Sequence, residues 1–340
     1  MRRDAAAGII AWQGRRVFIT GATGFVGRHV ARRLVAAGAQ VRALVRAGSR
    51  PDRRVPHGVE CHPGALDDEA AIRAAAAGCS HAFHIAAHVR YDDDWETATR
   101  VNVDGTRAVV ESTRAAGVRC FVHTSSIVTI GASRTAAPLD EDASWNLADR
   151  RIPYITTKRR AEEFVLAAGA PGFDVVVVNP ASVIGPDDPG PSEFGLLCRR
   201  FWKGRIPFHF GGGINLVDVR DVASGHLLAA ERGVSGRRYI VGGENVTLPE
   251  FFGALSVAAS RRGRWLHLPN AVARPVAWVE RWLAPARHRR PYLSPERARV
   301  AGLFWHYETD RTLDELGLRS RPLADTLEDL YRDWFATEPR

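Results

Sequence analysis

The chain has 340 residues, 45% of them hydrophobic and 25% charged, which is typical of a globular protein with a sizeable core. No apolar run approaches the roughly 20 residues that cross a bilayer, and residues 1–14 lack the apolar core of a signal peptide, so we interpret them as an N-terminal extension of a cytoplasmic protein. The net charge of +9 rests on arginine, since only two of the 47 basic residues are lysine, and this genomic bias makes the charge poor evidence for nucleic-acid binding.

The first predicted element is a strand that runs into a glycine-rich turn and then into a helix. Residues 16–27 read Arg-Val-Phe-Ile-Thr-Gly-Ala-Thr-Gly-Phe-Val-Gly, an apolar run followed by glycines spaced by three. Helical periodicity continues from there to Gly38, a typical helix stop. Such a turn lets a pyrophosphate approach the backbone, where the unpaired N–H groups of the helix start face the anion. The stretch therefore predicts a dinucleotide-binding site.

Strands and helices then alternate along the chain. Strands are predicted at 40–46, 59–63, 82–87, 118–125 and 175–178, and helices at about 67–77, 97–116 and 154–168. The four consecutive valines of 175–178 are typical of a strand that is covered on both faces. This alternation predicts an α/β fold with a doubly wound parallel sheet of the Rossmann type.

The regular alternation ends beyond Pro180. We place the dinucleotide-binding domain at 15–185 and a smaller, mostly helical substrate-binding cap at 186–340, with 214–242 returning to the sheet domain. Within the cap, 271–290 carries tryptophans and valines beside arginines. This stretch fits a helix that packs on its own domain or walls an apolar pocket, and it also fits an interfacial helix in peripheral membrane contact. The basic runs 50–54 and 287–290 are candidate contacts for phosphate groups or anionic lipid heads.

No metal site or disulfide is predicted. His81, His84 and His88 span a strand and its exit, so they cannot all face one ion. The cysteines lie far apart, without a Cys-x-x-Cys pair, and are predicted to be reduced: Cys61, Cys79, Cys120 and Cys198.

The catalytic candidates are a tyrosine and a lysine on a predicted helix. Tyr154 and Lys158 are four residues apart, which puts both side chains on one helix face. An ammonium beside a phenol stabilises the phenolate and lowers a pKa that is ordinarily near 10, which makes the tyrosine a usable acid or base. Lys158 is one of only two lysines in an arginine-rich chain, as expected if the chemistry requires a compact ammonium rather than a guanidinium. Upstream, 124–126 reads Thr-Ser-Ser and offers hydroxyl groups to hold a carbonyl oxygen.

Together these motifs resemble the extended (atypical) short-chain dehydrogenases/reductases, the NAD-dependent epimerase/dehydratase superfamily. The resemblance extends over nearly the whole chain and includes His84-Ile-Ala-Ala87, Asn102-Val-Asp-Gly-Thr106, Asn179-Pro180 and Asp218-Val-Arg-Asp-Val222. Within that superfamily the chain is most similar to the dihydroflavonol-4-reductase-like and hopanoid-associated sugar epimerase group.

The resemblance implies a role for each matching residue. Tyr154 would exchange the proton with the substrate oxygen, Lys158 would lower the pKa of Tyr154 and bind the nicotinamide ribose, and Ser126 would hydrogen-bond the substrate oxygen. Ser125 is the alternative to Ser126. The implied cofactor-binding residues are Gly21, Thr23, Gly24, Phe25, Val26 and Gly27 at the pyrophosphate, Leu66 at the adenine, Ala86 and Ala87 along the cofactor, and Pro180 and Ser182 near the nicotinamide.

The choice of cofactor depends on Arg46. An acidic residue at the end of the second strand would bind the ribose 2′-hydroxyl of NAD(H), whereas the arginine found here suits a 2′-phosphate, so we expect NADP(H) over NAD(H). Residues 64–66 read Gly-Ala-Leu where the superfamily usually has Gly-Asp-Leu. Adenine contacts are therefore expected from backbone groups near Leu66.

These observations lead to one expected function and two alternatives. We expect an NADP(H)-dependent oxidoreductase that acts on a carbonyl or secondary alcohol of an apolar small molecule, such as a flavonol-, sterol- or terpenoid-like compound, an aldehyde or a ketone. The first alternative is a nucleotide-sugar epimerase or dehydratase with tightly bound NAD, and the second is a non-catalytic NADP-binding sensor. The resemblance also implies a homodimer through the helices predicted at 97–116 and 154–168.

Overall fold

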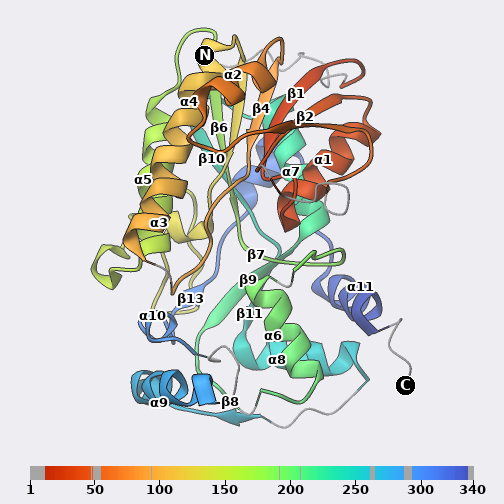
Figure 1. Cartoon of the computed structure of the whole chain (residues 1–340). Helices are drawn as coiled ribbons and strands as arrows, with labels where there is room; N and C mark the ends of the chain where they lie inside the picture. Colours follow the sequence, from red (N-terminus) through yellow and green to blue (C-terminus); the bar gives the residue numbers. More distant parts are fainter. Residues whose placement is uncertain are drawn as a thin grey trace.

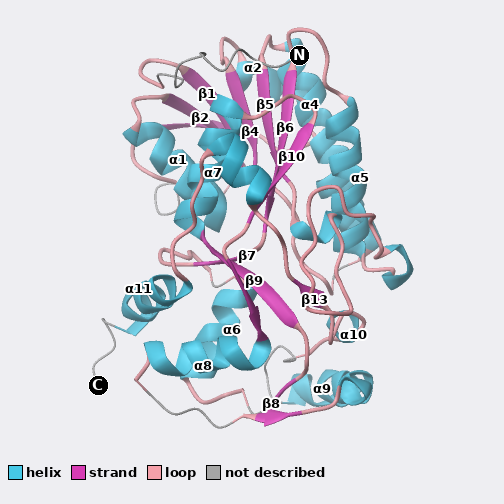
Figure 2. Ribbon diagram, turned by 180° about the vertical axis from the view of Figure 1, so that it is seen from behind, coloured by secondary structure: helices cyan, strands magenta, loops and turns pink. Residues whose placement is uncertain are grey.

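The computed structural model describes residues 12–46, 48, 55–92, 94–190, 192–206, 208–260, 265–286 and 293–335. The chain forms a sheet domain with helices on both faces, and below it in Figure 1 a cap built from the later part of the sequence. Figure 2 shows the same two parts from behind. None of the described helices is both long enough and apolar enough to span a bilayer.

Seven parallel strands form the sheet, in the order β10-β6-β5-β4-β1-β2-β3. Because the order reverses beside β1, a crevice opens where β1 and β4 end, the usual place for a ligand in such a sheet. The predicted doubly wound fold is confirmed. The strands are β1 (Arg16–Thr20), β2 (Gln40–Val45), β3 (Val59–Pro63), β4 (His81–His84), β5 (Cys120–Thr124), β6 (Asp174–Pro180) and β10 (Arg237–Val241).

Helices cover both faces of this sheet. One face carries α1 (Phe25–Ala36) and α7 (Val219–Arg232), and the other carries α2 (Glu69–Ala76), α4 (Gly105–Ala115) and α5 (Pro153–Ala167). The valine run of β6 divides between the two sides: Val176 and Val178 belong to the core under α1 and α7, and Val175 and Val177 to the opposite core. The run is therefore buried on both faces, as its composition predicts.

The helix predicted at 97–116 has an irregular segment in its middle. It consists of α3 (Trp95–Thr99), a π-helical stretch (Arg100–Asp104) and α4. In the π segment, the side chain of Asn102 accepts a hydrogen bond from the backbone N–H of His88 at 2.7 Å and donates one to its carbonyl at 2.9 Å. The segment after β4 is thereby held out of the sheet, so β4 ends at His84 rather than at residue 87.

The cap contains more strand than its sequence predicts. In one sheet, β9 (Gly213–Asp218) pairs with β7 (Ser182–Ile184), β11 (Glu244–Thr247) and β13 (Phe304–Trp305). A separate two-stranded sheet consists of β8 (Phe208–His209) and β12 (Leu266–His267). Apart from β9, which has six residues, these strands have two to four residues and are too short to show an alternating pattern. The cap helices are α6 (Glu193–Trp202), α8 (Leu248–Ala258), α9 (Ala273–Ala286), α10 (Pro295–Ala298) and α11 (Leu323–Phe335). Short helical turns are Ile127–Thr129, Ala148–Arg150, Asn270–Val272 and Thr312–Leu316.

Two boundaries differ from those expected. Within 214–242, β9 belongs to the cap sheet, and the return to the sheet domain begins at Val219 with α7 and continues in β10. At the other end, Trp12 was assigned to the extension but is buried: its indole lies 5.1 Å from the His81 ring and donates a hydrogen bond to Glu231 of α7 at 2.6 Å. The sheet domain therefore includes Trp12.

Candidate functional site

A single cleft of about 1430 Å³ runs from the carboxyl ends of the parallel strands into the cap. It is lined by every residue that the sequence assigns to catalysis or cofactor binding. These are Gly21, Thr23, Gly24, Phe25, Val26, Gly27, Arg46, Leu66, Ala86, Ala87, Ser126, Tyr154, Lys158, Pro180 and Ser182.

The glycine turn forms one end of the cleft. Gly21 has a φ of +78°, and a Cβ on it would lie 2.6 Å from the backbone nitrogen of Ala86, so a side chain is excluded on both counts. A Cβ on Gly27 would collide with the carbonyl oxygen of Gly21. The helix that follows begins at Phe25, and its capping residue Gly24 provides no side-chain hydrogen bond. Its first N–H groups are thus left for an anion in the cleft.

A hydroxyl at the end of β1 fixes the neighbouring wall. Thr20 accepts hydrogen bonds from the backbone N–H groups of Ile85 and Ala86, both at 3.2 Å, and its Oγ1 lies 2.7 Å from Nδ1 of His84. The other ring nitrogen of His84 lies 3.0 Å from the hydroxyl of Thr106, so both ring nitrogens have partners inside the protein. Across the described residues, no group of three or more His, Cys, Asp or Glu side chains is arranged to hold a metal ion.

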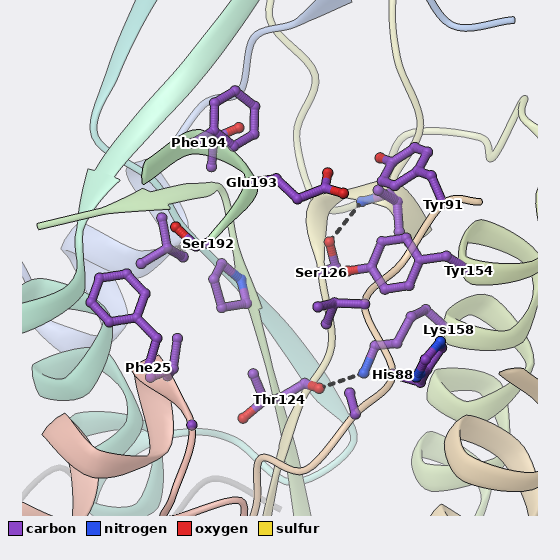
Figure 3. A pocket seen from close by; sticks show the side chains of 18 of the residues that line it. Phe25, His88, Tyr91, Thr124, Ser126, Tyr154, Lys158, Ser192, Glu193 and Phe194 are labelled. Carbon is purple, nitrogen blue, oxygen red and sulfur yellow. Dashed lines mark hydrogen bonds between the residues drawn. The ribbon is translucent and has the colours of Figure 1, made fainter. Parts of the chain in front are cut away.

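Tyr154 meets Ser126 on the floor of the cleft (Figure 3). Burial raises the pKa of Tyr154 to about 12, and a hydrogen bond from Ser126 opposes that shift by stabilising the phenolate. Ser126 is held in turn by the backbone N–H of Val128, 3.4 Å from its Oγ. The neighbouring Ser125 also lines the cleft, but its buried hydroxyl has no hydrogen-bond partner among the described residues. Of the two serines, Ser126 is thus the one whose hydroxyl acts on the pKa of Tyr154.

Lys158 lies one helical turn beyond Tyr154 and is almost fully buried. Its Nζ donates to the carbonyl oxygen of Thr124 at 2.7 Å, so it points into the cleft at the end of β5. Burial lowers the pKa of Lys158 to about 8, and the charge of Glu162 opposes that shift. Lys158 is not among the groups that shift the pKa of Tyr154 in this structure. A lowering of the Tyr154 pKa by Lys158 therefore stays a prediction.

Glu162 is a third residue on this face of α5, and the sequence analysis missed it. Its carboxylate is buried, accepts hydrogen bonds from Thr129 and Asn179, both at 2.6 Å, and pairs with Arg238 of β10 at 3.0 Å. Its position four residues after Lys158 is the signal that could have identified it. The buried anion supports the charge of Lys158 from behind the cleft.

The cap contributes an ion pair to the same place. Glu193, in the first turn of α6, pairs with Arg297 of α10, and its carboxylate points toward Tyr154 and Tyr91 (Figure 3). Burial raises the pKa of Glu193 against the opposing charge of Arg297. The ring of Tyr91 lies 5.3 Å from that of Tyr154. The two charged residues are 104 positions apart, so no local sequence pattern connects them.

The remaining cap side of the cleft is apolar. Among the described residues that line it, Glu193 and Arg297 carry the charge, and they pair with each other. The apolar lining residues are Phe194, Leu197, Phe210, Ile214, Leu248, Phe252, Leu293, Val300, Ala301, Leu303 and Trp305.

The opposite end of the cleft is polar. Arg46 lies directly after β2, and Asp67 lies near the residues that follow β3. Asp68 caps α2, accepting a hydrogen bond from the backbone N–H of Ala71 at 3.0 Å, so Asp67 is not needed for the cap. Asp67 is thus an acidic group in the cleft that the sequence analysis missed. The open helix start, the side-chain-free turn and the unpaired Ser125 hydroxyl together fit a nicotinamide dinucleotide.

The chain is similar to known proteins over nearly its whole length. The profile of the NAD dependent epimerase/dehydratase family matches residues 17–242. A putative dihydroflavonol 4-reductase from Synechocystis is 35% identical over 323 residues, 94% of each chain. Sterol demethylase protein B from Methylococcus capsulatus is 33% identical over 307 residues, 88% of this chain and 92% of that protein. The crystal structure of gox2253 superimposes with a TM-score of 0.82 at 32% identity, over 94% of this chain and 98% of that one.

Proposed function

Since the chain belongs to the NAD dependent epimerase/dehydratase family and is an oxidoreductase of the extended short-chain dehydrogenase/reductase type, we propose that it transfers a hydride between NADP(H) and the carbonyl or secondary alcohol of an apolar small molecule. The observation that carries this proposal is the meeting of Tyr154 and Ser126 at the boundary between the glycine turn and the apolar side of the cap.

In this proposal each residue of the site has one task. The bound nicotinamide supplies or accepts the hydride. Ser126 hydrogen-bonds the substrate oxygen, and the phenolic O–H of Tyr154 gives its proton to that oxygen in reduction or takes one in oxidation. Lys158, held by Thr124 at 2.7 Å, binds the ribose and favours the ionised form of Tyr154 while it is itself charged.

The cap supports an apolar substrate. A nucleotide sugar brings two phosphate charges, which need cations or helix starts to replace their water. On the cap side of the cleft, the described lining offers only one cation, Arg297, and Glu193 already pairs with it. The names of the two relatives, a putative dihydroflavonol reductase and a sterol demethylase protein, agree with a ring-containing apolar substrate. The nucleotide-sugar epimerase alternative is therefore the weaker one.

The preference for NADP(H) is supported by Arg46. Its position directly after β2, in the lining of the cleft, is where the adenosine ribose of a dinucleotide lies in this type of sheet. A guanidinium there pairs with a 2′-phosphate, whereas a 2′-hydroxyl needs an acceptor. Asp67 lines the same end of the cleft and is a candidate for such an acceptor.

The direct test is consumption of NADPH with a panel of ketones, aldehydes, flavonoids and sterols. We expect net oxidation of NADPH with at least one apolar carbonyl compound and little with NADH. Turnover of UDP-sugars without net cofactor consumption would establish the epimerase alternative and refute the proposal. A preference for NADH would refute the cofactor assignment while leaving the reaction type in place.

We further propose a cytoplasmic homodimer that pairs through α4 and α5. The basis is the resemblance of these two helices to the dimer-forming pair of related enzymes. A monomeric mass by light scattering at micromolar concentration would refute the dimer.

A further inference from the structure

We propose that α9 docks this protein on an anionic lipid surface, with the outer side of the helix lying in the headgroup layer. The docking surface consists of the exposed apolar residues Val272, Trp278, Val279, Trp282 and Leu283 together with the exposed arginines Arg274 and Arg281. This inference concerns a surface outside the cleft and does not depend on the proposed reaction.

The first observation is where the protein exposes large apolar side chains. Nine such side chains are exposed in the described part of the chain, and five of them form the docking surface. Trp278 and Trp282 are 63% and 73% exposed, and their rings lie 6.2 Å apart on adjacent turns. Tryptophan belongs at the boundary between water and lipid, because its ring is apolar while its N–H stays hydrated.

The second observation is charge. Residues 261–290 contain eight arginines and one acidic residue, a formal charge of +7, whereas the whole chain carries +9. The other 310 residues are thus nearly balanced, so a uniform arginine bias does not account for this segment. Arg274 and Arg281 are seven positions apart on α9 and flank the tryptophans; the basic residues at 261–264 and 287–290 lie outside the described residues. A basic helix with an apolar outer face is the pattern of an interfacial helix.

The third observation is the inner side of the same helix. Ala273 and Ala277 are buried in a small core with Phe210, Leu293 and Ala298. Phe210 and Leu293 also line the cleft. Figures 1 and 2 both place α9 at the end of the cap far from the seven-stranded sheet, beside the β8–β12 pair. The helix is already packed on one side, so its outer apolar face is additional to what the fold needs.

Charge also decides between lipid and a second copy of the chain as the occupant. Two copies meeting through this face would bring the exposed arginines Arg274 and Arg281 of one copy against the same two arginines of the other. Like charges in contact oppose such an association. An anionic lipid surface is complementary to the same charge and accepts the tryptophans without a matching groove.

The test is co-sedimentation of the full-length protein with vesicles. We expect binding to phosphatidylcholine vesicles that contain one third phosphatidylglycerol, much weaker binding to pure phosphatidylcholine, and release at high salt. The double variant Trp278→Ser with Trp282→Ser should bind at least roughly tenfold more weakly, and Arg274→Gln and Arg281→Gln should each weaken binding about fivefold.

The matched control is Trp95→Ser, which removes a tryptophan that is 46% exposed on α3 of the sheet domain. It should bind vesicles like the wild type, and all variants should keep the wild-type circular dichroism and NADPH affinity. Failure of the wild type to bind anionic vesicles, or equal binding by the double tryptophan variant, overturns the proposal. A wild-type dimer that the double variant converts to a monomer, without vesicle binding, shows that the face is an interface between copies and also overturns it.

Discussion

Glu193 and Tyr154 face each other across the cleft, although one comes from the cap and the other from the sheet domain (Figure 3). The negative charge of Glu193 raises the pKa of Tyr154, in addition to the larger effect of burial. A charge carried by the cap thus acts on the proposed acid–base group of the sheet domain. Substrate binding that moves Glu193 would change how readily Tyr154 gives up its proton.

The first prediction is that Glu193→Gln shifts the ionisation of Tyr154 to lower pH. The substitution removes an anion and leaves the charge of Arg297 unmasked, and both changes favour the phenolate. In reduction, where Tyr154 must be protonated, the falling limb of kcat/KM against pH should move down by up to about one pH unit. The measurement is a pH–rate profile with a ketone that the substrate panel identifies.

Asp92→Asn is the control for that profile. The charge of Asp92 acts on Glu193 and is not among the groups that shift Tyr154. The falling limb of kcat/KM against pH for Asp92→Asn should coincide with that of the wild type. Identical limbs for Glu193→Gln and the wild type would show that Glu193 does not act on Tyr154 during turnover.

The second prediction concerns the phenol itself. Tyr154→Phe keeps the ring beside Tyr91 and removes the exchangeable proton, so the rate should fall at least roughly a hundredfold while NADPH still binds. Tyr91→Phe is the matched control, because burial and neighbouring charges raise the pKa of Tyr91 beyond use as an acid or base. It should retain most of the rate. Equal losses in the two variants would contradict the role of Tyr154.

The third prediction is a change of cofactor. Arg46→Asp replaces the cation at the end of β2 by an acceptor for a ribose hydroxyl, so the ratio of kcat/KM for NADPH over NADH should fall at least about tenfold. Arg114→Asp makes the same charge change on the exposed end of α4 and should leave the ratio unaltered. An unchanged ratio in Arg46→Asp would remove Arg46 from the cofactor site.

The fourth prediction is that Lys158→Met stabilises the protein. The pKa of Lys158 is about 8 in the folded protein and ordinarily 10.5, so the unfolded chain binds its proton more tightly. The resulting cost to stability is fully present below pH 8 and disappears as the pH rises through 10.5. After loss of the hydrogen bond to Thr124, the gain at pH 7 should be roughly 2 kcal/mol.

Urea denaturation of Lys158→Met and the wild type at several pH values tests this prediction. The difference in free energy of unfolding should shrink between pH 8 and pH 10.5. Lys203→Met, at the exposed end of α6, should change stability by less than about 0.5 kcal/mol. A destabilised Lys158→Met variant would mean that the buried ammonium contributes to the fold rather than costing stability.

Much of the sheet domain could be predicted because its signals are local. The valines of β6 and the apolar run of β1 are continuous, and the pattern that predicts dinucleotide binding lies within the seven residues 21–27. Tyr154 and Lys158 are one turn apart on a single helix. Glu162 lies four residues after Lys158, so the same helical spacing places it on the same face of the helix.

The rest of the site depends on contacts between distant parts of the chain. Glu193 and Arg297 meet only because α6 and α10 are brought together by the cap, and neither residue stands out in its own segment. β4 ends three residues before its predicted end because distant side chains hold the segment after it: the N–H groups of Ile85 and Ala86 donate to Thr20, and the backbone of His88 pairs with Asn102. The two- to four-residue strands of the cap leave no alternation to detect.

The two sides of α9 have a kinetic consequence. A helix is about 10 Å across, so the buried alanines that support the cleft lining and the tryptophans that face outward are separated by little more than one helix diameter. If α9 lies on lipid as proposed, a water-insoluble substrate would be drawn from a two-dimensional reservoir a short distance from the cleft. The relevant concentration is then its mole fraction in the lipid. Adding substrate-free lipid at constant total substrate dilutes that reservoir and slows turnover.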